Sequence, residues 1–433
     1  MSINTERTAV LGLGYVGLPL ALEMVRAGCV VYGIDKDVSK VNQLKDGSSY
    51  VLDVPDGAVM ESVRNGRFLP TTDFGVLADV DAISICVPTP LRKTKDPDLS
   101  YVLSAVSEVR DHLQKGQLVI LESTTYPGTT DELVCPVLEE TGLKVGKDFF
   151  LAFSPERVDP GNMKYTTKNI PKVIGGVTPE CTSRAVEYYS RFFDTVVPVS
   201  SSREAEMVKL MENTFRAVNI ALVNEMALMC DRMGVNVWEV INAAATKPFG
   251  YMPFYPGPGI GGHCIPLDPV YLSWKAKTYN FFNRFIDLAT DINANMPRYV
   301  VAKVAELLNH HQRSLNGAKI LLLGVAYKRD INDVRESPAE DVYKLLKGYG
   351  AAVEYNDPYV PFLEWYGELL QSVELSDGVL GSYDCVVLIT NHSDYNYHNI
   401  ERSARLILDT RNAFKDIESL KVFSLGAMNT GGL

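Results

Sequence analysis

Apolar positions near the amino terminus follow the pattern of a strand, a tight turn, a helix and a second strand. The segment TAVLG (residues 8–12) is a short apolar run, and LPLALEMVRAG (18–28) has apolar residues at helical spacing with Gly28 as its stop. CVVYGID (29–35) follows as a second buried strand. This alternation is typical of a sheet of parallel strands covered by helices.

The same alternation continues after residue 80 and returns after residue 318. Further apolar runs with strand character are DAISICVPTP (81–90), QLVILESTTYPG (117–128), KILLLG (319–324), AAVEYNDP (351–358), YDCVVLIT (383–390) and ARLILDTRN (404–412). Helical spacing separates them, as in DLSYVLSAVSEVRDHLQ (98–114) and SPAEDVYKLLKGYG (337–350). The later half lacks a second Gly-x-Gly-x-x-Gly, because Gly324 is followed by Val-Ala-Tyr, so a second dinucleotide site is not expected.

The middle of the chain has a different character. Residues 203–234 keep helical periodicity without a proline or an internal glycine, and a helix of that length often forms a domain spine or a dimer contact. More helical pattern runs from about residue 267 to 308. The sequence therefore predicts an α/β fold of two Rossmann-like, doubly wound parallel-sheet domains, 1–200 and 313–433, joined by a long central helical region, 201–312.

Length and composition agree with several domains and exclude some partners. A chain of 433 residues exceeds what one core usually supports. The net charge of −11 offers no basic stripe for a nucleic acid. No segment reaches the roughly 18 uninterrupted apolar residues of a membrane span, and the apolar amino terminus lacks a basic start, so we expect no membrane partner and a cytoplasmic location.

The cysteines and histidines do not form a metal-binding pattern. The seven cysteines are scattered and never spaced as Cys-x-x-Cys, and the six histidines do not cluster with them. Reduced thiols of a cytosolic protein fit this distribution better than disulfides or a zinc site. We therefore predict no metal.

The segment GLGYVG (12–17) fits a dinucleotide fingerprint. Gly12 permits the turn, Gly14 lets a pyrophosphate approach backbone amides at a helix start, and Gly17 lets the helix pack on the strand. The pattern follows a strand, opens a helix and precedes Asp35 at the end of the next strand, where a carboxylate accepts hydrogen bonds from ribose hydroxyls. Because Asp35 would repel a 2′-phosphate, the cofactor is predicted to be NAD rather than NADP.

Polar residues that follow strands or share a helix face are candidates for chemistry. Thr125 lies just past a strand end, where open α/β sheets bind ligands, and Glu156 lies in a loop after the run FFLAF; either is equally well a solvated turn residue. Lys209 and Asn213 lie four apart on the long helix and share a face among apolar neighbours, although a solvated stripe explains the spacing as well.

Cys264 lies between a glycine-rich loop and a Pro-Leu-Asp-Pro turn, four residues before Asp268. Most buried cysteines are inert packing residues. A packing residue does not need glycines beside it, and the other cysteines lie in apolar strands or helices. Cys264 is therefore the candidate nucleophile.

Six motifs in order resemble the UDP-glucose/GDP-mannose dehydrogenase family over nearly the whole chain. They are GLGYVG (12–17), STTYPG (123–128), SPER (154–157), EMVKLMENTFRA (206–217), GPGIGGHCIPLDP (257–269) and YKRDINDVRES (327–337). The resemblance implies an amino-terminal NAD domain, a central helical region for dimerisation and catalysis, and a carboxy-terminal domain that holds the nucleotide sugar. It also implies a homodimer or higher homo-oligomer that supplies surface-polysaccharide precursors.

The resemblance also implies roles for individual residues. Cys264 resembles the nucleophile, with Lys209, Asn213 and Asp268 as its polar companions, and Thr125 and Glu156 resemble residues that handle water or a proton. Further cofactor contacts implied by the motifs are Tyr15, Val16, Thr89, Thr125 and Arg335, and further substrate contacts are Glu156, Arg157, Lys209, Asn213, Gly261 and Lys328.

The implied reaction is a four-electron oxidation of a sugar C6 alcohol to a carboxylate. An aldehyde cannot lose a second hydride until a group adds to its carbonyl carbon, and a thiolate at Cys264 would give a thiohemiacetal and then a thioester. Lys209 would favour the thiolate and, with Asn213, stabilise negative charge on the substrate oxygen. Either Asp268 or Glu156 would activate the hydrolytic water.

The flanks of Cys264 differ from those of glucose-oxidising members. HCIPLDP (263–269) and PERVDPG (155–161) are similar to the UDP-N-acetylhexosamine branch. UDP-N-acetylglucosamine is the first expected substrate, and UDP-N-acetylmannosamine and UDP-glucose are alternatives. The usual second glutamate after Pro-Glu is missing, and Asp159 is the residue that would replace it. A two-electron hydroxy acid dehydrogenase with an idle Cys264 and an NAD-responsive regulator are the competing hypotheses.

Overall fold

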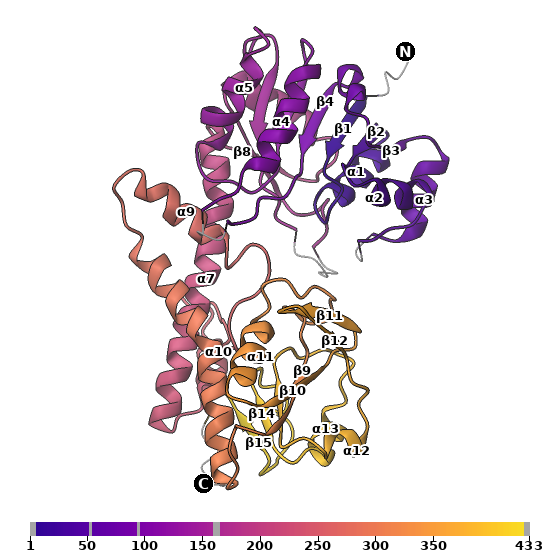
Figure 1. The fold of residues 1–433 in the computed structure, drawn as a ribbon. Coiled ribbons are helices and arrows are strands. Elements are labelled where there is room, and N and C mark those ends of the chain that lie inside the picture. The colour runs from indigo at the N-terminus through magenta and orange to yellow at the C-terminus, as the bar shows by residue number, and fades with distance from the viewer. Residues whose placement is uncertain (1–5, 52–53, 93–95, 159–164, 428–433) are drawn as a thin grey trace. The chain divides into compact units, whose positions relative to one another are not determined.

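The computed structural model describes residues 6–51, 54–92, 96–158 and 165–427, and the chain forms two compact units (Figure 1). The first unit comprises Met1–Glu212 and Val270–Phe281, and the second comprises Asn213–Pro269 and Phe282–Leu433.

A single large sheet forms the centre of the first unit. Among the described residues its eight strands are ordered β3-β2-β1-β4-β5-β6-β7-β8. They are β1 (Arg7–Leu11), β2 (Val30–Ile34), β3 (Phe68–Thr71), β4 (Ala82–Ile85), β5 (Leu118–Leu121), β6 (Phe150–Phe153), β7 (Lys172–Gly176) and β8 (Val196–Pro198).

Helices cover both faces of this sheet. They are α1 (Gly17–Arg26), α2 (Val38–Lys45), α3 (Asp56–Arg64), α4 (Ser100–His112), α5 (Cys135–Glu139) and α6 (Pro179–Tyr189), with the 3₁₀-helix η1 (Phe74–Asp79) and the π-helix η2 (Thr129–Val134). Successive β1 residues enter different cores: Val10 packs with Leu20 of α1, whereas Ala9 packs with Val106 of α4. Full burial of a valine or leucine side chain stabilises the fold by roughly 1.5–3 kcal/mol.

One pair of neighbours in the sheet departs from the predicted parallel arrangement. β6 and β7 are antiparallel, with Phe153 opposite Gly175, whereas the pairs from β3 to β6 are parallel. The described part of their connection, residues 154–171, contains no helix, and parallel neighbours usually need a helical crossover. The two glycines that end β7 also fit tightly. A Cβ at Gly175 would lie 1.9 Å from the Ser201 carbonyl oxygen, and one at Gly176 would lie 2.3 Å from the Thr182 amide nitrogen.

The predicted long helix is present as α7 (Ser202–Met233). The predicted helical pattern of 267–308 is divided into α9 (Asp268–Lys277) and α10 (Arg284–His310). The chain turns between them, where Asn280 has a φ of +58°, a value that ends a right-handed helix and that asparagine tolerates better than most residues.

A second, wholly parallel sheet forms the centre of the second unit, as predicted. Among the described residues its order is β10-β9-β13-β14-β15, and a separate antiparallel hairpin pairs β11 with β12. The strands are β9 (Lys319–Leu323), β10 (Ala352–Asn356), β11 (Phe362–Trp365), β12 (Glu368–Gln371), β13 (Cys385–Leu388), β14 (Ile407–Asp409) and β15 (Val422–Ser424). The remaining helices are α8 (Val237–Ala244), α11 (Pro338–Gly348), α12 (Asp377–Leu380) and α13 (Tyr397–Ser403).

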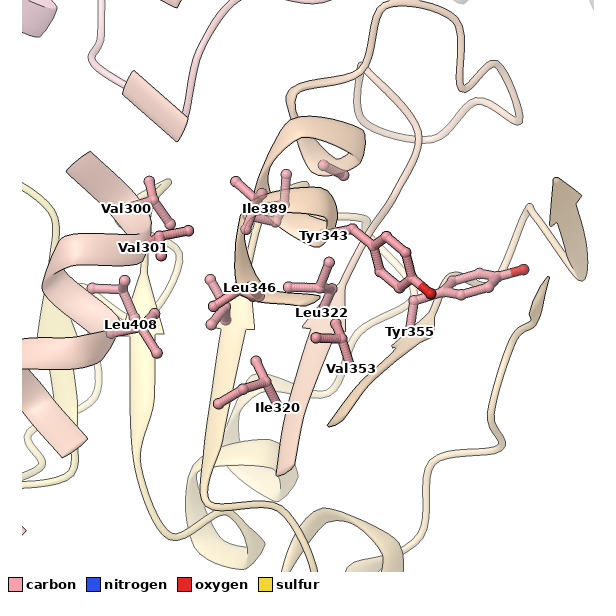
Figure 2. Packing of buried hydrophobic residues seen from close by; sticks show 14 of the residues in the cluster. Val300, Val301, Ile320, Leu322, Tyr343, Leu346, Val353, Tyr355, Ile389 and Leu408 are labelled. Atoms are coloured by element: carbon pink, nitrogen blue, oxygen red, sulfur yellow. The ribbon is translucent and has the colours of Figure 1, made fainter. Parts of the chain in front are cut away.

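Side chains from α10, α11 and the strands pack into one core of this unit. Figure 2 shows Val300 and Val301 of α10, Leu346 of α11, and Ile320 and Leu322 of β9 in this cluster. Alternate β9 residues, Leu321 and Leu323, enter a second core with α12 and α13. The sheet is thus covered on both faces, and the predicted α/β class is confirmed for both units.

Candidate active site

The glycine-rich turn after β1 has the shape of a dinucleotide cradle. Gly12 has a φ of +87°, and a Cβ there would lie 2.7 Å from the Cys86 carbonyl oxygen. A Cβ at Gly17, the first residue of α1, would lie 1.9 Å from the Gly12 oxygen. Beside Gly14, by contrast, a Cβ would meet nothing within 4 Å. The loop therefore closes tightly against its strand and leaves room at the start of α1, where amide groups attract a phosphate.

The other predicted cofactor residues lie at or near strand ends in the same unit. Asp35 follows β2 and accepts a hydrogen bond from the Leu13 amide at 3.0 Å, which holds its carboxylate against the glycine turn. Tyr15 is partly exposed in that turn. The Thr89 carbonyl, after β4, accepts a hydrogen bond from the Tyr271 hydroxyl. Together with the glycines, this donor and acceptor set fits a dinucleotide.

Thr125 and Lys209 belong to neighbouring parts of the first unit. The Lys209 ammonium, on α7, donates to the hydroxyl of Thr124, the residue before Thr125. Thr125 is buried, and its own hydroxyl has no hydrogen-bond partner among the described residues. A buried hydroxyl without a partner costs free energy, so a water molecule or a ligand atom is its natural complement.

Glu206 fastens the loop after Thr125 to α7. Its carboxylate accepts from the Gly128 amide at 2.6 Å, the Thr130 amide at 2.9 Å and the Thr130 hydroxyl at 2.7 Å. Burial raises the pKa of Glu206 to about 7, although the hydrogen bonds from Thr130 and Gly128 act in the opposite direction. The loop that carries Thr124 and Thr125 therefore rests on a carboxyl group that titrates near neutral pH.

Glu156 lies in the loop after β6 and is held at both oxygens. One oxygen accepts from the amides of Arg157 at 2.8 Å and Val158 at 2.7 Å. The other lies 3.5 Å from the Lys172 ammonium. The Arg157 guanidinium, predicted to bind substrate, forms a two-pronged ion pair with Glu212 at 2.6 and 3.2 Å and donates to the Pro171 carbonyl. Asp159 lies outside the described residues.

Sequence reasoning missed a buried charged cluster beside Glu156. The Lys172 ammonium lies 2.5 Å from one Glu122 oxygen, and the Tyr189 hydroxyl donates to the other. Burial raises the pKa of the Glu122 carboxyl, against the opposing effect of Lys172. A signal was present in the sequence, since Glu122 ends the apolar run QLVIL and Lys172 begins KVIGG. Strand order is needed to see that the two meet.

In the second unit, Asn213 and Asp268 meet directly. The Asn213 amide donates to the Asp268 carboxylate at 2.6 Å, and both side chains are buried. The Asp268 backbone amide donates to the Cys264 carbonyl at 2.8 Å. One hydrogen-bonded turn therefore links the candidate nucleophile to the start of α9, where Asp268 is the first residue.

Cys264 differs from the other cysteines in exposure. It is partly exposed, whereas the other six are buried. Burial raises the pKa of the Cys29 and Cys135 thiols to about 11 and that of Cys385 to about 12. Since the thiolate is the reactive form, these three cysteines are protonated and inert near neutral pH.

The glycines before Cys264 pack closely against another segment of the second unit. A Cβ at Gly261 would lie 2.7 Å from both the Glu336 carbonyl oxygen and the Tyr327 Cβ, and one at Gly262 would lie 2.8 Å from the Tyr327 ring. Sequence reasoning explained these glycines by the approach of a substrate. The structure gives them a second reason, because residues 327–336 occupy the space that side chains would need.

His263 and Arg335, from two of the six motifs, meet at Asp333. The His263 ring nitrogen lies 3.0 Å from the Asp333 carboxylate, and the Arg335 guanidinium donates hydrogen bonds to the same carboxylate at 2.7 and 2.9 Å. Although burial alone would raise it, the hydrogen bonds from His263 and Arg335 hold the pKa of Asp333 well below its usual range. The loop that carries Cys264 and the segment YKRDINDVRES, which includes Lys328, are thereby joined.

The predicted catalytic residues belong to both units. Thr125, Glu156 and Lys209 are in the first unit, and Asn213, Cys264 and Asp268 are in the second. No helix in the described ranges is both long and apolar enough to cross a membrane. Within those ranges, no three histidine, cysteine or carboxylate side chains gather as metal ligands would.

Three family models match the chain in order. Residues 6–193 match the NAD binding domain of the UDP-glucose/GDP-mannose dehydrogenase family, residues 203–295 its central domain, and residues 321–416 its UDP binding domain.

Individual proteins are similar over nearly the whole length. A UDP-N-acetyl-D-mannosamine dehydrogenase from Methanococcus maripaludis is 35% identical over 94% of this chain and 93% of its own. A UDP-N-acetyl-D-glucosamine 6-dehydrogenase from Pseudomonas aeruginosa is 35% identical over 92% of this chain and 94% of its own. The solved structure of a UDP-D-ManNAc dehydrogenase from Pyrococcus horikoshii, 35% identical, superimposes with a TM-score of 0.89 over 99% of this chain and 100% of that chain.

Proposed function

The chain belongs to the UDP-glucose/GDP-mannose dehydrogenase family, and from that premise we propose that it oxidises the C6 alcohol of UDP-N-acetylglucosamine to a carboxylate. It is an NAD-dependent UDP-sugar dehydrogenase of the UDP-N-acetylhexosamine branch. The observation that carries the proposed chemistry is the setting of Cys264, a partly exposed thiol one hydrogen-bonded turn from the Asn213–Asp268 pair.

We assign the cofactor to the turn between β1 and α1. Gly12, Gly14 and Gly17 would take the pyrophosphate at the helix start, and Asp35 would take the ribose hydroxyls. NAD, when bound, accepts a hydride from the sugar carbon in each of the two oxidations.

Cys264 acts between these oxidations. Its thiolate adds to the aldehyde carbon formed in the first, and the carbonyl oxygen takes a proton to give a thiohemiacetal. Loss of a hydride and that proton gives a thioester, and water then releases the carboxylate and restores the thiol. Per sugar, one alcohol, two NAD and one water become one carboxylate, two NADH and three protons.

Polar neighbours serve the same steps. We assign Lys209 and Asn213 to the developing charge on the substrate oxygen. Glu156, held by two backbone amides, is the proposed base for the water that attacks the thioester. Thr125, whose buried hydroxyl has no partner among the described residues, is suited to hold that water.

UDP-N-acetylmannosamine is the second candidate substrate, because proteins named for oxidising it are as similar as those named for the glucosamine sugar. The test is NADH formation against UDP-N-acetylglucosamine, UDP-N-acetylmannosamine, UDP-N-acetylgalactosamine and UDP-glucose. We expect the highest kcat/KM with UDP-N-acetylglucosamine and two NADH per sugar consumed. One NADH per sugar would contradict the thioester route, and clear preference for another sugar would contradict the substrate assignment.

We also propose that the protein is a cytoplasmic homodimer formed through α7. Apolar side chains exposed on this helix fall at spacings of four or seven residues, which places them in one stripe: Met207, Met211, Phe215, Leu222, Met229 and Met233. Such a stripe on a surface helix is typical of a contact between subunits. Seven cysteines without a disulfide fit the reducing cytoplasm.

A further inference from the structure

Three neighbouring strands deliver charged side chains to one edge of the first sheet. Glu122 follows the last residue of β5, Glu156 lies three residues past β6, and Lys172 is the first residue of β7. β7 runs antiparallel to β6, so it begins at the edge where β5 and β6 end. Continuing the register of Phe153 opposite Gly175 by three residues places Glu156 opposite Lys172.

The contacts agree with this register. The Lys172 ammonium lies 2.5 Å from Glu122 and 3.5 Å from Glu156, and the exposed side-chain fractions are 5% for Lys172, 0% for Glu122 and 9% for Glu156. The Tyr189 hydroxyl donates a hydrogen bond to the second Glu122 oxygen, and the centroid of the Tyr189 ring lies 5.5 Å from the Lys172 ammonium.

Stability alone does not explain such a cluster. Replacing a buried ion pair with apolar residues of similar volume is often neutral or stabilising. Glu122 and Lys172 stand at the ends of two otherwise apolar strand segments, at the edge where open α/β sheets bind their ligands.

We propose that Lys172 is a positioning residue that fixes the Glu156 carboxylate for activation of the hydrolytic water, and that Glu122 holds Lys172 in place. This role rests on the proposed function, because it assumes that Glu156 is the base. Two backbone amides hold one oxygen of Glu156, and the ammonium faces the other, so the side chain is restrained at both ends. Lys172 acts through Glu156 and is not assigned a contact with the substrate.

Two neighbours of Glu156, Lys172 and Glu122, have opposite charges, so we expect their removal to have opposite effects on the reaction. The Lys172 ammonium on β7 attracts the negative charge of Glu156, and the Glu122 carboxylate after β5 repels it. Cys86 after β4 and Tyr189 on α6 are buried, and burial raises the pKa of both well above their usual values, so both stay neutral. Arg157, in the same loop, is paired with Glu212 on α7. Among these groups, Lys172 and Glu122, which pair with each other, are therefore the charges of opposite sign that act on Glu156.

The experiment compares the full-length enzyme with Lys172→Met, Glu122→Gln and the conservative variant Lys172→Arg. Rapid mixing with UDP-N-acetylglucosamine separates the first NADH from release of the carboxylate, and the release rate is followed from pH 5 to 9. We expect Lys172→Met to move the acidic limb of this profile upward by about one to two pH units. Glu122→Gln should move it downward, and Lys172→Arg should keep it near the wild-type position.

A double variant separates this role from folding. Lys172→Met with Glu122→Gln removes both charges of the buried pair, and its acidic limb should lie between those of the two single variants while its melting temperature stays near that of the wild type. The role of Lys172 would be overturned if the acidic limbs of the pH profiles do not move, or if they move in the same direction in both single variants. In that case the turnover of the wild-type enzyme would still support the proposed function. A wild-type enzyme that oxidises no UDP-sugar would instead overturn the proposed function, and the role of Lys172 with it.

Discussion

At the scale of single residues, exposure separates one thiol from six others. Cys264 is partly exposed after a glycine-rich loop, whereas the remaining cysteines are buried, three of them with pKa values raised to about 11 or 12. Only an accessible thiol can be reached by a sugar carbonyl. The environment, and not the residue type, selects the candidate nucleophile.

We predict that Cys264→Ser stops release of the uronic acid. A hydroxyl is far less ionised than a thiol at neutral pH, so the rate of carboxylate formation should fall at least about a thousand-fold. NAD affinity, measured by isothermal titration calorimetry, should stay within about two-fold of the wild type, because the cofactor is assigned to the β1–α1 turn. Cys135→Ala, which changes a buried thiol, is the matched control and should keep its turnover. Undiminished acid release by Cys264→Ser would remove the residue from the mechanism.

The sequence predicted candidate residues whose surroundings are local, and it missed the charged neighbours that depend on strand order. For Gly12, Gly17 and Cys264, the signal lies next to them in the chain. The two glycines belong to a tight turn, and the cysteine follows a glycine-rich loop. Glu122 and Lys172 are 50 residues apart, and nothing local indicates that they touch. The family motifs contain Glu156 but not its charged partners.

At the scale of elements, a single carboxyl group supplies three of the hydrogen bonds between α7 and the segment around Gly128 and Thr130. Glu206 accepts three hydrogen bonds from Gly128 and Thr130. Lys209, one helical turn later, donates to Thr124 in the same loop. The helix therefore sets the position of the loop that carries Thr125.

This contact predicts a pH dependence of stability. Burial raises the pKa of Glu206 from 4.5 to about 7, so the folded state favours the protonated group more than the unfolded state does. Its stabilising contribution is present below about pH 4.5 and is lost as the pH rises to about 7, by up to about 3 kcal/mol. Chemical denaturation should show a smaller decrease in the free energy of unfolding between pH 5 and 8 for Glu206→Gln than for the wild type. An equal decrease in both proteins would contradict the assignment.

Elements that follow from periodicity alone were predicted well. The strand, turn, helix and strand of residues 8–35, the long helix at 202–233 and the second α/β half are all present. The reversal at β7 and the break between α9 and α10 were not predicted. The apolar pattern of a strand does not show whether it runs parallel or antiparallel to its neighbour. One asparagine with a positive φ is enough to end a helix without proline or glycine.

At the scale of the whole molecule, the apolar stripe of α7 predicts an assembly. The double variant Leu222→Glu with Met229→Glu puts two charges two turns apart on the stripe. We expect it to be a monomer by light scattering at a concentration where the wild type is a dimer. Arg216→Gln, which is exposed on the same helix and has no stripe residue three or four positions away, is the control and should remain a dimer. A wild-type monomer, or a dimer unaffected by the double variant, would contradict the proposed interface.

The last consequence concerns Gly175 and Gly176, which end β7. A side chain at either position would collide with backbone atoms of Ser201 or Thr182, so any other residue there would force the strand to slide or lift. Lys172 begins the same strand and would be carried with it, away from its place opposite Glu156. Two residues that have neither charge nor side chain therefore fix the register of β7, and with it the position of Lys172 relative to Glu156.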